Sequence, residues 1–211
     1  MDDHLLRFKK NLKYIIFDFE TCNLNLLQDN DPWQLSFSVC EGKEVVQEYD
    51  LFPFWPDLKM GKGAADITRF NYFDYKKKSS DARECLEIFE RYVFDKEYLL
   101  VGHNVLNFDV YVHQLFRKKL GLSKDYSYLS RIIDTNILSK SYKLQMAPDH
   151  SNLLAWQYRV GSIIQKGLKT NLGAMCKEFG IEYDKGQAHS GSYDCKVNKD
   201  LFIKLINTID I

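Results

Sequence analysis

The chain has 211 residues, of which 45% are hydrophobic and 27% are charged, and its 29 basic and 29 acidic residues leave a formal net charge of +0. These values are those of one soluble globular domain, which we expect to cover residues 1–211. No apolar run approaches the roughly 18 residues that a membrane span needs, so no membrane partner is expected. The neutral balance also argues against long-range electrostatic binding of a nucleic-acid duplex.

Five cysteines are scattered along the chain without a Cys-x-x-Cys pair. An odd number of dispersed cysteines does not form a disulfide framework, and their spacing does not fit a structural zinc site. The N-terminus is acidic and lacks the apolar region of a signal peptide. We therefore expect a reducing, intracellular and cytoplasmic setting.

The first predicted element is a strand at residues 14–19, an apolar run in which two carboxylates, Asp18 and Glu20, stand two residues apart at its end. Because side chains alternate along a strand, these carboxylates lie on the same face. Like charges at a buried strand end repel each other unless a cation neutralises them. The pair is a candidate metal site, and an ordinary strand end that enters a polar turn is the alternative.

An antiparallel meander is predicted around and after this strand. Polar residues at 23–32 indicate a loop. Bulky residues alternate with polar ones from Trp33 to Cys40, which indicates a half-buried strand. A turn at 41–43 leads to a returning strand at 44–51.

Helices and short strands alternate in the rest of the chain. Residues 52–71 contain prolines and glycines and are expected to be irregular, with 62–68 as a small flexible segment beside the site. The order implies a mixed sheet with helices on its faces, the α/β class. Caps and apolar periodicity predict the following elements: a helix that begins after 79–81 and ends at 93, a strand at 98–101, a helix at 107–120, a strand at 132–135, a helix at 171–179, a loop at 181–191 and a helix at 192–207.

The segment 139–169 has the least readable pattern. Its aromatic residues, among them Tyr142, Trp156 and Tyr158, are interleaved with lysines, and such a pattern can stack bases and bind phosphates. A helical insertion whose aromatics pack is preferred, since core aromatics are commoner than stacking platforms. Four further basic clusters are candidate phosphate contacts, although for each one a solvated surface without substrate contact is preferred. They are Lys76–Lys78, Arg117–Lys119, Lys140 with Lys143, and Lys166 with Lys169.

Two later stretches each add an aspartate to the first carboxylate pair. Asn104, Phe108 and Asp109 stand in an Asn-x₃-Phe-Asp pattern, and His189 and Asp194 stand in a His-x₄-Asp pattern. With the Asp-x-Glu of the first strand, they resemble the three motifs of the DEDD (DnaQ-like) 3′→5′ exonucleases, and the histidine marks the DEDDh branch. Each motif alone is weak, but the three in this order, over most of the chain, are a strong signal.

The resemblance implies an RNase H-like fold, with three antiparallel strands followed by two parallel ones and helices on both faces. It also implies a metal role for each carboxylate: Asp18 would bridge two cations, Glu20 and Asp194 would complete the first ion's site, and Asp109 would hold the second ion. Carboxylate oxygens suit Mg²⁺ or Mn²⁺. Two such ions about 3.5–4 Å apart can supply a nucleophile and stabilise a phosphoryl group.

His189 is the expected general base, because a histidine pKa lies near operating pH. The resemblance implies that its loop is mobile and brings it in when substrate is bound. It also implies that Thr21 and Cys22 line the pocket of the 3′ nucleotide, with His103 and Asn104 nearby. A packed, hydrogen-bonded core histidine is the alternative for His103.

The expected activity is hydrolysis of the terminal phosphodiester of single-stranded or frayed DNA from the 3′ end, with release of 5′-mononucleotides. The spacing of the second motif resembles exonuclease I-type enzymes more than the polymerase proofreading subunit, and the third motif has Ser190–Tyr193 where many members are rich in alanine. An RNA-trimming exoribonuclease, a proofreading or scaffold subunit that binds a DNA polymerase, and a non-catalytic nucleic-acid-binding module are the alternatives. The oligomeric state stays open.

Overall fold

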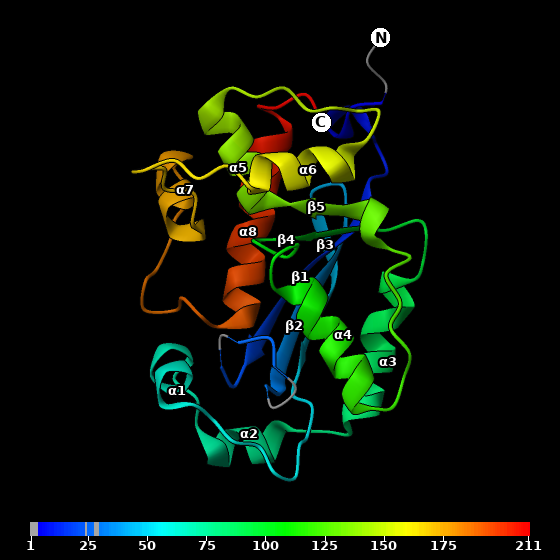
Figure 1. Ribbon diagram of the computed structural model, residues 1–211, viewed down its shortest axis with the longest axis vertical. Coiled ribbons are helices and arrows are strands. Elements are labelled where there is room, and N and C mark those ends of the chain that lie inside the picture. The colour runs from blue at the N-terminus through cyan, green and yellow to red at the C-terminus, as the bar shows by residue number, and fades with distance from the viewer. Residues whose placement is uncertain (1–3, 24, 28–29) are drawn as a thin grey trace.

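A computed structural model describes residues 4–23, 25–27 and 30–211. Figure 1 shows one sheet with helices packed around it. The elements in chain order are η1 (Leu6–Phe8), β1 (Lys13–Thr21), β2 (Pro32–Glu41), β3 (Glu44–Leu51), α1 (Lys62–Thr68), α2 (Tyr72–Lys78), α3 (Ala82–Val93), β4 (Leu99–Gly102), α4 (Asp109–Lys119), η2 (Leu129–Arg131), β5 (Ile132–Asp134), α5 (Thr135–Leu144), α6 (Leu153–Gly161), α7 (Leu172–Glu178) and α8 (Gly191–Ile206).

The five strands form one mixed sheet in the order β3-β2-β1-β4-β5. The pairs β1–β2 and β2–β3 are antiparallel, whereas β1–β4 and β4–β5 are parallel. This confirms the predicted α/β architecture of three antiparallel strands followed by two parallel ones. The carboxyl ends of β1, β4 and β5 meet at one edge, which is where open α/β sheets bind ligands.

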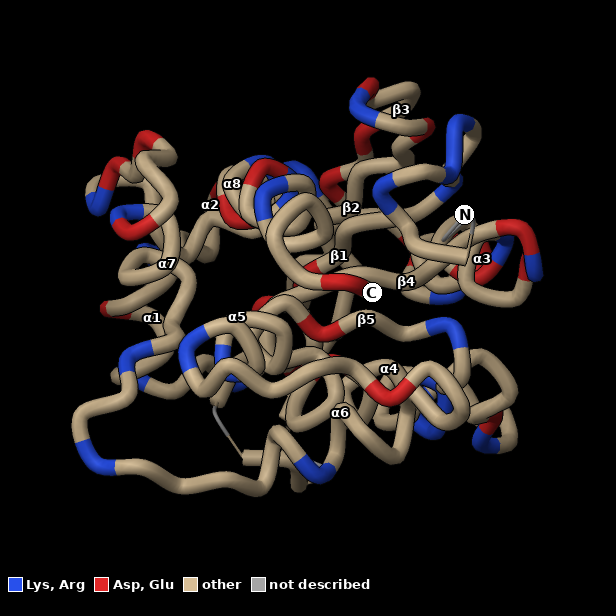
Figure 2. Tube along the Cα trace, turned by 90° about the horizontal axis from the view of Figure 1, so that it is seen from above, with Lys and Arg blue, Asp and Glu red and all other residues tan. Residues whose placement is uncertain are grey.

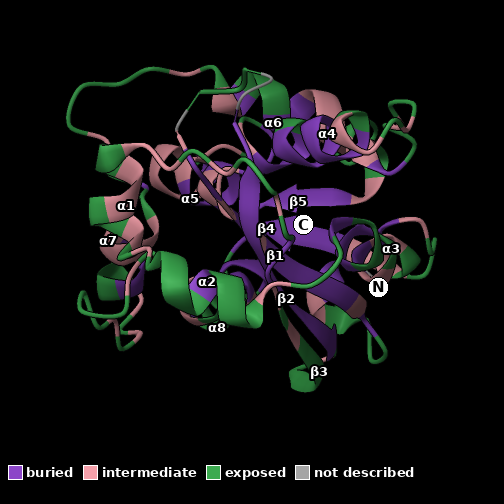
Figure 3. Cartoon of the chain, turned by 90° about the horizontal axis from the view of Figure 1, so that it is seen from below, coloured by how far each residue is buried: buried purple, intermediate pink, exposed green. Residues whose placement is uncertain are grey.

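The side chains of β1 divide between two helical layers. Tyr14 contacts Phe202 of α8, with ring centroids 5.0 Å apart, whereas Phe17 contacts Phe89 of α3 at 5.3 Å. Because side chains alternate along a strand, the carboxylates of the first motif lie on the α8 face. Figure 3 shows the buried sheet between these layers, with exposed residues on the outer faces of the helices.

The prediction of a half-buried β2 is wrong, because its residues from Pro32 to Cys40 are all buried. The polar face is covered by α8, where the Cys195 thiol lies 3.3 Å from the carbonyl oxygen of Ser36. The side chains of Gln34 and Ser36 donate hydrogen bonds to Asp50 Oδ1 at 2.6 and 2.7 Å. The alternating pattern indicated a solvated face, but a helix from the far end of the sequence packs on it.

The stretch 52–71 is more regular than predicted. The segment expected to be flexible forms α1, and α2 follows after Asn71, whose side chain accepts a hydrogen bond from the Asp74 N–H at 3.0 Å. These helices lie at the lower end of the molecule in Figure 1. Tyr75 of α2 belongs to a second small core, together with Cys22, Trp33 and Phe52.

The segment 139–169 contains α5 and α6, and most of its aromatic residues pack as preferred. Trp156 is buried, and Tyr142 lies against Phe179 with ring centroids 5.1 Å apart. Tyr158 differs, since 42% of it is exposed. The other predicted strands and helices lie within two residues of their expected bounds, and the predicted loop at 23–32 includes residues 24, 28 and 29, which lie outside the described residues.

All five cysteines are free and buried, which agrees with the predicted absence of a disulfide framework. No helix within the described ranges is both long enough and apolar enough to cross a membrane.

Candidate active site

The second motif meets the first at the free edge of β1. Strand β4 pairs with β1 only from Tyr14 to Ile16, and no other strand in the described part of the chain pairs with the following part of β1 on that side. There the Phe19 N–H donates a hydrogen bond to Asp109 Oδ1 at 2.9 Å. Asp109 is the buried first residue of α4, where the helix dipole favours a negative charge. The bond places the carboxylate beside the first pair.

Another buried carboxylate, Asp134, holds the loop that leads to Asp109. Burial raises the pKa of Asp134 to about 6, against the opposing effect of backbone hydrogen bonds. The sequence analysis placed this residue in a predicted strand at 132–135 without a further role, whereas the fold makes it the N-cap of α5 and a hydrogen-bond acceptor for the loop at 103–108. The N–H groups that donate to its carboxylate are those of Asn104 at 2.9 Å, Leu106 at 3.1 Å, Asn136 at 2.9 Å and Ile137 at 3.4 Å.

The third motif approaches the sheet closely because α8 begins with a glycine. A Cβ on Gly191 would lie 2.5 Å from Ser36 Oγ and 3.7 Å from Asp18 Oδ2, so a larger residue would displace the helix. Just before this helix, the His189 N–H donates to Asp194 Oδ2 at 3.0 Å. His189 has a φ of 62°, a left-handed conformation in which histidine is enriched among residues other than glycine.

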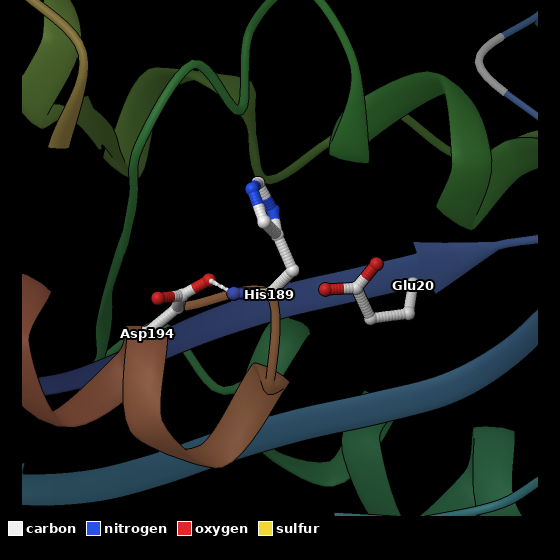
Figure 4. A group of neighbouring side chains, drawn as sticks. All are labelled: Glu20, His189 and Asp194. Carbon is white, nitrogen blue, oxygen red and sulfur yellow. Dashed lines mark hydrogen bonds between the residues drawn. The ribbon is translucent and has the colours of Figure 1, made fainter. Parts of the chain in front are cut away.

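Glu20, His189 and Asp194 come together as one group. Each residue offers one atom that can ligate a metal, and these three atoms all lie within 4.8 Å of one another. Figure 4 shows the exposed His189 rising from the loop before α8, with Asp194 on one side and Glu20 of β1 on the other. Asp18 and Asp109 lie outside this three-residue group, but the charge of Asp109 raises the pKa of Glu20, and the charges of Glu20 and Asp194 raise that of Asp18.

Burial raises the pKa of all four motif carboxylates, and repulsion from the other motif carboxylates adds to this for Asp18 and Glu20. Burial raises the pKa of Glu20 to about 8, with further repulsion from Asp194 and Asp109. Burial also raises the pKa of Asp109 to about 7 and that of Asp194 to about 6. The pKa of Asp18 rises well above its usual range, through burial and then through all three neighbours.

These carboxylates lack the partners that would compensate their charge within the fold. Among the described residues, none of the four forms an ion pair with a lysine or arginine. The second oxygen of Asp194, Oδ1, is buried and has no hydrogen-bond partner in the part of the chain that the structure describes. Clustered carboxylates with an unsatisfied buried oxygen fit a hard divalent cation. The chain therefore contains a possible metal-binding group of acidic and histidine side chains.

Of the four residues predicted to line a nucleotide pocket, Thr21 and Cys22 are buried, whereas His103 and Asn104 are partly exposed. Thr21 is 5% exposed, and Cys22 is fully buried in the second core, so the Cys22 side chain has no surface to offer a substrate. His103 Nδ1 lies 3.0 Å from Thr135 Oγ1, and burial lowers the pKa of His103 to about 4. The other ring nitrogen, Nε2, is buried and has no hydrogen-bond partner among the described residues, so the place of His103 in a nucleotide pocket stays a prediction. Asn104 is partly exposed beside it, with a φ of 68°.

Several of the candidate phosphate-binding lysines and arginines serve the fold instead. Figure 2 shows basic residues on many sides of the molecule and not on one face. Lys76–Lys78 on α2 and the pair Lys166 and Lys169 are exposed. The other clusters include side chains held by ion pairs or carbonyl groups: Arg117 with Glu90, Lys119 with Asp31, Lys143 with Glu178, and Lys140 with the Gly161 carbonyl.

Comparison with known proteins relates the whole chain to nucleases and to a polymerase. No protein-family model matches it. Among curated proteins, it is 24% identical over 201 residues to the PolC-type DNA polymerase III of Ureaplasma parvum serovar 3, a match that covers 94% of this chain and 12% of the polymerase. The chain therefore spans about an eighth of the length of that relative.

Solved structures of exonuclease I from E. coli have the same architecture. The complex with a dA16 oligonucleotide superposes with a TM-score of 0.71 at 16% identity, over 94% of this chain and 41% of the other. The zinc ion-bound complex with single-stranded DNA gives 0.71 at 14% identity, over 93% and 42%. The chain thus has the RNase H-like fold of exonuclease I, as its likeness to the DEDDh, DnaQ-like exonucleases predicted.

Proposed function

We propose that this chain is a single metal-dependent exonuclease domain that shortens single-stranded or frayed DNA from the 3′ end and releases 5′-mononucleotides. The observation that carries the proposal is the meeting of Glu20, His189 and Asp194, within 4.8 Å, beside two further motif carboxylates. The solved exonuclease I complexes with single-stranded DNA, and the polymerase relative, support DNA as the polymer. The chain spans only part of each of those proteins, so a larger protein or a polymerase partner is compatible with this role.

The carboxylates Asp18, Glu20, Asp109 and Asp194 would hold two divalent cations, Mg²⁺ or Mn²⁺. Bound there, the cations would neutralise the phosphoryl charge and make a water molecule nucleophilic at neutral pH. Their binding would also remove the repulsion that helps to raise the pKa of Asp18 and Glu20.

His189 is the proposed general base. It stands exposed beside the acidic group and accepts a proton from the attacking water at a ring nitrogen. A bond forms between the water oxygen and phosphorus, and the bond to the 3′ oxygen of the preceding nucleotide breaks. The hydrogen bond from the His189 N–H to Asp194 joins the backbone of the proposed base to a carboxylate of the proposed metal site.

The test is an assay with a 5′-labelled single-stranded DNA and the matching RNA, with Mg²⁺ or Mn²⁺ and with chelator. We expect a ladder that shortens from the 3′ end of DNA and disappears with chelator. Preference for RNA would move the assignment to an exoribonuclease of the same fold. Absence of degradation of both polymers by a folded protein that still binds Mn²⁺ would overturn the proposal of an enzyme active on its own.

A further inference from the structure

Three exposed tyrosines come from separate elements on or beside α4 and α6. They are Tyr111 on α4, Tyr126 in the loop after α4 and Tyr158 on α6, with exposed fractions of 43%, 37% and 42%. Helix α6 contacts η2, which begins three residues after Tyr126. The pKa of Tyr158 is raised by burial and then by the charges of Tyr111 and Tyr126, which agrees with their proximity.

Two of these tyrosines border a concave site that also carries lysines. A cavity of about 230 Å³ lies between α4 and two loops, and its lining includes Leu26, Tyr111, Lys118, Lys124 and Tyr126. Tyr111 and Lys118 are seven residues apart on α4 and so share one face of the helix. Both lysines are exposed.

Buried side chains hold the loop that carries Lys124 and Tyr126 in place. The amide of Gln114 makes two hydrogen bonds with the backbone of Asp125, donating to its carbonyl at 2.7 Å and accepting from its N–H at 2.8 Å. Arg117 Nε donates to the Ser123 carbonyl at 2.9 Å. The loop is therefore ordered before any ligand binds, which lowers the entropic cost of binding.

This surface and the proposed catalytic centre share α4. Tyr111 follows Asp109 by two residues, so it lies about 3 Å further along the helix axis and about 200° around it, on the exposed side of α4, whereas Asp109 is on the buried side. Leu26 belongs to the segment that follows Glu20 at the end of β1. A strand whose 3′ end occupied the acidic group would pass over the start of α4 to reach this surface.

We propose that Tyr111, Lys118, Lys124, Tyr126 and Tyr158, which we call the tyrosine surface, bind the single strand on the 5′ side of the bond that is cut. The tyrosine rings stack on bases and the lysines contact phosphates, a combination that binds single strands with little dependence on sequence. The one acidic residue of the loop, Asp125, accepts a hydrogen bond from the Ser127 N–H at 2.9 Å. The proposal rests on the proposed function and adds a location for the strand.

The test measures binding of 5′-fluorescein-labelled dT16 in chelator by anisotropy, for Tyr111→Ala, Tyr126→Ala, Tyr158→Ala and the triple variant. Loss of one stacking ring should weaken binding by at least about fivefold, and loss of all three by at least about 100-fold. Replacement of each of these three tyrosines by phenylalanine keeps the aromatic ring and should retain the affinity for dT16. Lys118→Ala and Lys124→Ala should each reduce the slope of log affinity against log salt by about 0.7.

The matched controls are Tyr72→Ala and Phe73→Ala on α2, whose side chains are 53% and 76% exposed. These should bind dT16 like the parent protein. In the presence of Mn²⁺, kcat/KM of the triple variant should fall at least tenfold more for dT16 than for the dinucleotide dT2. A folded triple variant that binds dT16 like the parent, or an equal loss in the α2 controls, would overturn the tyrosine surface.

Hydrolysis of the thymidine 5′-monophosphate p-nitrophenyl ester by the parent protein separates this proposal from the proposed function. If the parent hydrolyses neither the ester nor dT16, the proposed function is wrong. The comparison of dT16 binding among the variants still tests whether the tyrosine surface binds the strand, because binding is measured without catalysis.

Discussion

The two ends of α4 lie against acidic groups that the fold treats in opposite ways. Near its C-terminal half, Glu90 Oε1 accepts a hydrogen bond from His113 Nε2 at 2.8 Å and another from Arg117. Burial would raise the pKa of Glu90, but these partners together lower it. At its N-terminal end, Asp109 belongs to a group of carboxylates that all have raised pKa values and no cationic partner among the described residues.

The difference separates a structural role from a binding role. A buried carboxylate that is paired inside the protein contributes to stability when it is ionised. A set of carboxylates gathered without internal cations is costly while it stays charged, and an external cation removes that cost. The following predictions test this contrast, from the largest expected effect to the smallest.

The largest effect is expected for Asp18→Asn, which removes one charge from the acidic group. We expect exonuclease activity to fall by at least about 10³-fold, because cation binding and phosphoryl stabilisation are lost together. Without metal, the variant should be at least as stable as the parent, since a repulsive charge is gone. Activity is measured on labelled dT16 and stability by thermal melting in chelator. Activity within tenfold of the parent would contradict the role of Asp18.

The next effect is expected for His189→Ala. Loss of a general base should lower kcat by about 10²–10⁴-fold. The increase in melting temperature on addition of Mn²⁺ should be largely retained, because the carboxylates remain. The matched control is His150→Ala, a histidine to which we assign no role and which is exposed on another part of the chain. Equal kcat values for both variants would show that His189 is not the base.

A loss of stability is expected for Glu90→Met at the other acidic region. The substitution leaves Arg117 and His113 without their acceptor in a largely buried place, and we expect the free energy of unfolding to fall by about 3 kcal/mol. Urea denaturation measures this change. The increase in melting temperature with Mn²⁺ should equal that of the parent. A reduced response to Mn²⁺ would show that the two regions are coupled.

The smallest effect is the pH dependence of the metal-free protein. The motif carboxylates have raised pKa values in the folded state, so the folded chain binds more protons than the unfolded chain between about pH 4 and pH 8. Stability should therefore decrease as the pH rises from 5 to 8, with a fall in melting temperature of about 2–6 °C. Glu90 acts in the opposite direction, because its lowered pKa contributes stability that is lost only as the pH falls below its ordinary value of 4.5.

Thermal melts in chelator between pH 5 and pH 8 check this prediction. Addition of Mg²⁺ or Mn²⁺ should restore more stability at pH 8 than at pH 5, because more of the carboxylates are then ionised. Asp18→Asn should show a flatter pH profile than the parent. A metal-free protein that is most stable at pH 8 would contradict the raised pKa values.

The sequence by itself determined the local parts of this protein. Alternation along a strand put Asp18 and Glu20 on one face, and the caps and apolar periodicity located α3, α4, α7 and α8. The His-x₄-Asp spacing placed a histidine just ahead of a helix that carries an aspartate in its first turn. Each of these depends on backbone geometry over a few residues, which the order of residues specifies directly.

Only the tertiary structure decided which of these parts meet. Three features join segments far apart in the chain: the covering of β2 by α8, the bond from the Phe19 N–H to Asp109, and the burial of Cys22 in the second core. Residue periodicity marks a face as apolar or polar but does not say which distant surface packs on it. That choice depends on how the volumes and hydrogen bonds of whole elements fit together, and so it appears only in the folded chain.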